Sequence, residues 1–116
     1  MKILIIINLV AELLVGLALL LAAKKLPDFK GTDGSGITMA RMYGVAAIMV
    51  GVLSYFVLQD LDNAVLVNYF LQSMILFHIG IAAVTLAAHF TKQMNGLGPG
   101  IFHTLMAIGF IYFLMQ

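Results

Sequence analysis

The stretch that decides the fold is residues 3–23, ILIIINLVAELLVGLALLLAA, an apolar run of 21 residues with one ionisable side chain, Glu12. A helix rises about 1.5 Å per residue, so this run is about 30 Å long and matches the hydrocarbon core of a bilayer. It is longer than the apolar core of a signal peptide, and it ends in Lys24 and Lys25 without a small-residue cleavage site. We therefore interpret it as a retained transmembrane helix.

The composition of the whole chain supports the same class. Hydrophobic residues make up 63% of the 116 residues and charged residues only 9%, whereas soluble domains are about half apolar and a quarter charged. The net charge of +1 argues against a nucleic-acid partner. Cysteine is absent, which excludes disulfides, thiolate metal sites and cysteine nucleophiles. The composition therefore predicts an integral membrane protein whose main surroundings are the lipid bilayer.

Three further apolar segments follow, at residues 38–58, 64–90 and 101–115. The last has only about 15 residues, so it must tilt little, lie in thinned bilayer or borrow residues from the preceding loop. Two loops rich in glycine, each with a proline, and a tight turn at residues 59–63 separate the segments. Gly34-Ser35-Gly36 is interpreted as a flexible loop. We predict an all-α integral membrane four-helix bundle that forms one transmembrane domain, residues 1–116.

The basic residues predict the orientation. Lys2 alone lies on the side of the two termini, and the side of the first and third loops carries Lys24, Lys25, Lys30, Arg41 and Lys92. Cytoplasmic loops carry an excess of lysine and arginine. We therefore expect a multi-pass protein of a bacterial inner membrane with both termini outside the cytoplasm.

Glu12 is the most informative polar residue, because an ionised carboxylate near the middle of a transmembrane helix is costly. Asn8 and Gly16 lie four residues to either side, so all three share one face, which we expect to point into the bundle. Two roles stay open. Glu12 binds a cation, relays a proton or orients a ligand, or it is protonated and joins helices by a hydrogen bond.

The second segment carries a stripe at helical spacing, formed by Arg41, Gly44, Ile48, Gly51 and Tyr55. Its glycines allow close backbone approach, so the stripe is expected to pack against another helix. Arg41, at the cytoplasmic end, either anchors the helix at the headgroups or binds a lipid phosphate or another anion.

The positions of the three histidines along their segments predict their depths in the membrane. The last two segments run antiparallel, and aligning them at their shared loop sets His89 and His103 at one depth. Both would then form a rim cluster with Arg41, and all three are candidates to bind a lipid or an anion. His78 would lie deeper, by about 11 Å relative to His103. That puts His78 near the level of Glu12, as its candidate partner.

Metal and cofactor sites are not assigned. A bis-histidine haem needs both ligands at one level, but His78 and His103 are expected at different depths. A metal site at His89 and His103 would lack a third ligand. Soft thioethers suit Cu(I), and three methionines cluster on the second segment, Met39, Met42 and Met49. Methionine is, however, common filler in apolar helices.

Glu12 in the first helix, Ala40-Arg41-Met42-Tyr43-Gly44 at the start of the second, and the overall length resemble small bacterial four-helix membrane proteins of the DoxX-like kind. The resemblance covers most of the chain as topology. It implies the fold and the membrane setting but no activity, because the functions of that family are mostly unsettled.

Two function hypotheses follow. The first is a noncatalytic accessory subunit or binding bundle in a membrane complex, with a protein partner or further copies of itself. The alternative is a membrane enzyme or transporter that acts on a lipophilic or ionic substrate through Glu12 and His78. The sequence leaves open the substrate, the partner, the oligomeric state and whether the chain is an enzyme.

Overall fold

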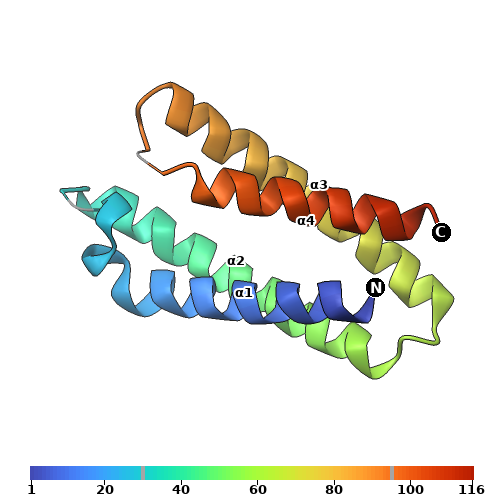
Figure 1. Ribbon diagram of the computed structural model, residues 1–116. Helices are drawn as coiled ribbons and strands as arrows, with labels where there is room; N and C mark the ends of the chain where they lie inside the picture. Colours follow the sequence, from blue (N-terminus) through green and yellow to red (C-terminus); the bar gives the residue numbers. More distant parts are fainter. Residues whose placement is uncertain (30, 95) are drawn as a thin grey trace. The chain divides into compact units, whose positions relative to one another are not determined.

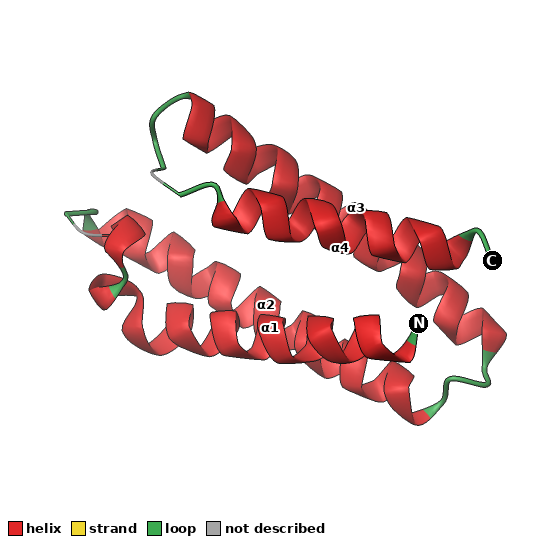
Figure 2. Ribbon diagram, viewed as in Figure 1, coloured by secondary structure: helices red, strands yellow, loops and turns green. Residues whose placement is uncertain are grey.

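A computed structural model describes residues 1–29, 31–94 and 96–116, and within these ranges the chain is helical and contains no strand (Figures 1 and 2). The described residues form four α-helices: α1, Lys2–Ala22; α2, Gly34–Gln59; α3, Ala64–Phe90; and α4, Gly98–Leu114. Two short 3-10 turns, Ala23–Lys25 and Pro27–Phe29, follow α1. The all-α prediction with four helices is confirmed. Lys30, which counted toward the predicted orientation, lies outside the described residues.

The chain divides into two compact units. One unit is Ile5–Gln59, and it contains most of α1 and all of α2. The other combines Met1–Leu4 with Asp60–Gln116, and it contains α3 and α4.

The start of α2 differs from the prediction. Gly34-Ser35-Gly36, interpreted as a flexible loop, forms the first turn of the helix. The reason is a cap: the Asp33 carboxylate accepts hydrogen bonds from the Gly36 amide at 2.8 Å and from the Ser35 hydroxyl at 2.7 Å. These bonds hold the pKa of Asp33 below its ordinary value, and they offset the poor helix propensity of the glycines.

Within the first unit, α1 and α2 run antiparallel and touch through glycines (Figure 1). A Cβ added to Gly16 would lie 2.7 Å from the Gly44 carbonyl oxygen, and one added to Gly44 would lie 2.8 Å from that of Gly16. A Cβ on Gly51 would lie 2.8 Å from the side chain of Leu13. The prediction that the glycine stripe of α2 packs against another helix is confirmed.

The stripe is buried only along its middle. Its two glycines are buried and Ile48 is half-buried, whereas Arg41 and Tyr55 at its ends are exposed. Arg41 therefore lies outside the buried part of the packing face of α2 and is exposed.

Within the second unit, α3 and α4 also run antiparallel (Figure 1). Phe70 meets Phe110 edge to face, with ring centroids 5.9 Å apart. At the other end of the pair, a Cβ on Gly100 would lie 2.6 Å from the side chain of Leu86. These two contacts fix the register, which places the first turn of α4 opposite Leu86 rather than opposite the last residues of α3.

Many large apolar side chains of the described helices are exposed, while a few polar side chains are buried. Ile3, Leu21, Leu76 and Phe90 are each about three-quarters exposed, whereas the buried polar side chains are Asn8, Glu12, Ser54, His78 and His103. Large apolar side chains at this exposure are typical of a surface that another apolar phase or partner covers. Three of the described helices, α1, α2 and α3, are long and apolar enough to cross a membrane, and α4 is a shorter apolar helix.

The contact at Gly51 generates the first prediction. Gly51→Leu should lower the free energy of unfolding by about 1–3 kcal/mol, because the new side chain must displace Leu13. Gly80→Leu on α3 is the matched control, since a Cβ at Gly80 meets no described atom within 4 Å. Unfolding of both variants in detergent micelles measures the difference. Equal loss from both would show that crowding at the α1–α2 contact is not the cause.

Candidate functional sites

The first candidate site lies between α1 and α2. Asn8, Glu12 and Gly16, spaced four residues apart, are all buried on one face of α1, as predicted. The Asn8 amide donates a hydrogen bond to the Ser54 hydroxyl on α2 at 2.9 Å, and that hydroxyl donates to the Val50 carbonyl at 2.9 Å. A chain of hydrogen bonds thus fixes the polar face of α1 against α2.

Glu12 is one turn along α1 from Asn8, and only 2% of it is exposed. Neither carboxylate oxygen accepts a hydrogen bond from the described residues of the α1–α2 unit. Tyr43, half-buried on α2, lies within electrostatic range of this carboxylate. A buried carboxyl group without a donor is costly, so it requires a proton of its own, a cation or a donor from outside the unit.

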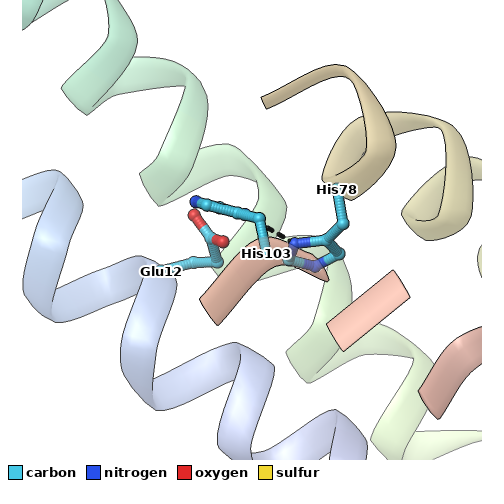
Figure 3. A group of neighbouring side chains, drawn as sticks. All are labelled: Glu12, His78 and His103. Atoms are coloured by element: carbon cyan, nitrogen blue, oxygen red, sulfur yellow. Dashed lines mark hydrogen bonds between the residues drawn. The ribbon is translucent and has the colours of Figure 1, made fainter. Parts of the chain in front are cut away.

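The second candidate site lies between α3 and α4. The imidazoles of His78 and His103 point at each other, with their Nδ1 atoms 2.7 Å apart (Figure 3). Both side chains are buried, with exposed fractions of 0% and 6%. One Nδ1 must donate a proton and the other accept it, so the neutral rings are opposite tautomers.

Aromatic rings surround this pair. His78 stacks on Phe110, with centroids 5.5 Å apart and planes inclined by 21°. Phe77 and Phe102 lie edge-on to the histidines at centroid distances between 5.2 and 6.4 Å. The two imidazoles therefore sit in an apolar pocket of the helix pair, where an electrostatic interaction is stronger than in water.

The predicted depths of the histidines are wrong. His103 lies against His78 and not at the level of His89, which is 11 residues, or about 16 Å, further along α3. The prediction aligned the two helices at their shared loop, but α4 begins at Gly98 and its Gly100 packs on Leu86. A rim cluster that includes both His89 and His103 therefore does not form.

The remaining predicted site residues are His89, Arg41 and Glu12. His89 is half-buried near the end of α3, and its Nδ1 has no hydrogen-bond partner among the described residues. Arg41 is exposed on α2. Glu12 belongs to the other unit, so its pairing with His78 stays a prediction.

The methionines divide into two groups. Met39, Met42 and Met49, which suggested a Cu(I) site, are each at least 60% exposed on α2. Met74 and Met106, which the sequence argument passed over, are 2% and 4% exposed. Their spacing from the histidines could have indicated them. Met74 precedes His78 by four residues and Met106 follows His103 by three, so each shares a helix face with its histidine. Ser54, also overlooked, lies three residues after Gly51 on the packing face of α2.

Comparisons of the chain with protein-family models, with curated proteins and with solved structures returned no match.

The hydrogen bond between the histidines generates the second prediction. Nitrogen-15 spectra of the neutral protein should show one of the two rings protonated at Nδ1 and the other at Nε2. His103→Ala should lower the free energy of unfolding by about 1–3 kcal/mol, because it leaves His78 without this partner. His103→Asn keeps a polar atom near the position of Nδ1, so it should lower the free energy of unfolding by less. Spectra with both rings protonated at Nε2 would contradict the proposed bond.

Proposed function

We propose that this chain crosses a bilayer several times as a four-helix bundle. The support is the apolar exterior of all four helices together with their buried polar side chains. Helices α1, α2 and α3 are long enough to span a membrane. The 17 residues of α4 give about 25 Å, so α4 crosses with little tilt or in slightly thinned bilayer.

The orientation we propose has both termini outside the cytoplasm of a bacterial inner membrane. It rests on the excess of basic residues in the first and third loops. The absence of cysteine allows a clean test, in which one cysteine is introduced at either terminus. A membrane-impermeant thiol reagent should label both variants in intact cells, and labelling that requires permeabilised cells would reverse the orientation.

The function we propose is that of a noncatalytic binding bundle, which acts as an accessory subunit of a membrane complex with a protein partner or further copies of itself. The observation that carries it is the Glu12 carboxyl group, which is buried in an apolar helix and receives no hydrogen bond from the described part of its own unit. A membrane-embedded acid is functional by default. Its chemistry selects a cationic occupant, either a proton or a positively charged group that replaces it.

The neighbours of Glu12 support binding. Asn8 and Ser54 hold each other on one side, and the Gly16–Gly44 contact fixes the two backbones on the other. The carboxyl group is thus held between two rigid contacts, an arrangement that limits the entropy lost when a ligand binds.

The third prediction tests this role. Dicyclohexylcarbodiimide dissolves in bilayers and adds to protonated carboxyl groups, and in reconstituted protein it should modify Glu12, as read by mass spectrometry. Sodium, potassium or octylammonium ions that occupy the site should slow the modification, because they replace the proton. Glu12→Gln should lose the label at this position, and the exposed loop residues Asp60 and Asp62 should stay unlabelled. A rate that no cation changes would contradict cation binding.

A membrane enzyme or transporter that acts through Glu12 and His78 is the second candidate function. The buried hydrogen bond between His78 and His103 favours it, because paired imidazoles can pass a proton between them. Proton flux into liposomes separates the two candidates. Flux that Glu12→Gln and His78→Asn each abolish supports transport, and its absence in the reconstituted protein supports the binding bundle. Membership of the DoxX-like group stays a proposal that rests on topology.

A further inference from the structure

The α3–α4 unit gathers four side chains that are ligands for soft metal ions. Two are the hydrogen-bonded imidazoles of His78 and His103, and two are the buried thioethers of Met74 and Met106. On α3, Met74 lies one turn from His78 toward Phe70. On α4, Met106 lies one turn from His103 toward Phe110.

The register of the two helices places both methionines between the same two contacts of α3 with α4. The Nδ1 atoms of His78 and His103 are 2.7 Å apart, and the ring centroids of Phe70 and Phe110 are 5.9 Å apart. Each methionine lies between these two contacts on its own helix. The helices run antiparallel, so both thioethers fall in the layer between the histidine pair and the phenylalanine pair.

We propose that this unit binds one Cu(I) ion through Nδ1 of His78 and Nδ1 of His103, with the thioethers of Met74 and Met106 completing the coordination. The proposal uses residues of the α3–α4 unit alone and does not depend on the function proposed above.

The type of ligand selects the metal. Imidazole nitrogen suits copper, zinc, iron and nickel, whereas thioether sulfur favours Cu(I). Helices α3 and α4 contain no carboxylate and no thiolate, so the unit's helices supply no anionic ligand to a divalent ion. The desolvation energy of an ion grows with the square of its charge, and it is several kcal/mol even for one charge in a protein interior. A monovalent ion that accepts neutral ligands is therefore the best match.

Binding requires a small rearrangement of the imidazoles. Metal–nitrogen bonds are about 2.0–2.1 Å long, so two nitrogens on one ion lie about 3.3–4.2 Å apart. The observed separation is 2.7 Å, and rotation of the side chains must open it. The ring that is protonated at Nδ1 must also move this proton to its own Nε2. No proton is released to solvent, and the copper is neither oxidised nor reduced.

The experiment is an anaerobic titration of the reconstituted protein with Cu(I) against bathocuproine disulfonate. The wild-type protein should bind one ion per chain, and His78→Asn or His103→Asn should weaken binding by more than about tenfold. Met106→Leu should weaken it less and reduce the sulfur scattering in the X-ray absorption spectrum, because only the Met74 thioether remains. The matched controls His89→Asn and Met49→Leu should bind as the wild type does, since neither residue belongs to the site.

The wild-type protein provides a readout that does not depend on the variants folding. Its X-ray absorption should show nitrogen and sulfur ligands to copper, and nitrogen-15 spectra of the loaded protein should show both His78 and His103 protonated at Nε2. The proposal is overturned if the wild type binds no Cu(I), if the histidine variants bind as tightly as it does, or if Met49→Leu removes the sulfur ligands.

Discussion

The contact between Gly16 of α1 and Gly44 of α2 determines how the first unit is built. Each glycine leaves no room for a Cβ on the other, so the two backbones lie closer than any pair of larger residues would allow. In a bilayer the hydrophobic effect does not drive helices together, and close packing and hydrogen bonds take over that role. The hydrogen bond from Asn8 to Ser54 depends on the same approach, and the position of Glu12 depends on both.

The second unit reaches a stable interface by other means. Large aromatic side chains fill the space between α3 and α4, and Phe110 contacts both Phe70 and His78. The imidazoles satisfy part of their hydrogen-bonding capacity with each other, which allows two polar rings to be buried among apolar ones. One unit thus places its buried polar groups beside glycines, and the other encloses them in aromatic rings.

The sequence allowed the helices and their faces to be predicted, but not the register of α3 against α4. Helix length, hydropathy and the 3.6-residue period are local properties, which is why the buried face of Asn8, Glu12 and Gly16 could be anticipated. Register depends on contacts between distant residues, here those of Gly100 with Leu86 and His78 with His103. Alignment at the connecting loop ignored these contacts and mispaired His103 with His89. The start of α2 was missed for a different reason, since the capping bonds of Asp33 outweighed the glycine content of its first turn.

The hydrogen bond between His78 and His103 also gives the α3–α4 unit a direction. Because only one of the facing nitrogens carries a proton, one ring presents an N–H at its far nitrogen and the other presents a lone pair. Exchanging the tautomers of both rings reverses this polarity without changing the net charge or the helix packing. The histidine pair therefore has two tautomeric arrangements, which carry the same protons but have the hydrogen bond in opposite directions. A group that contacts the Nε2 atom of either ring selects one of the two tautomeric arrangements. A change of proton position on one imidazole therefore changes the proton position on the other.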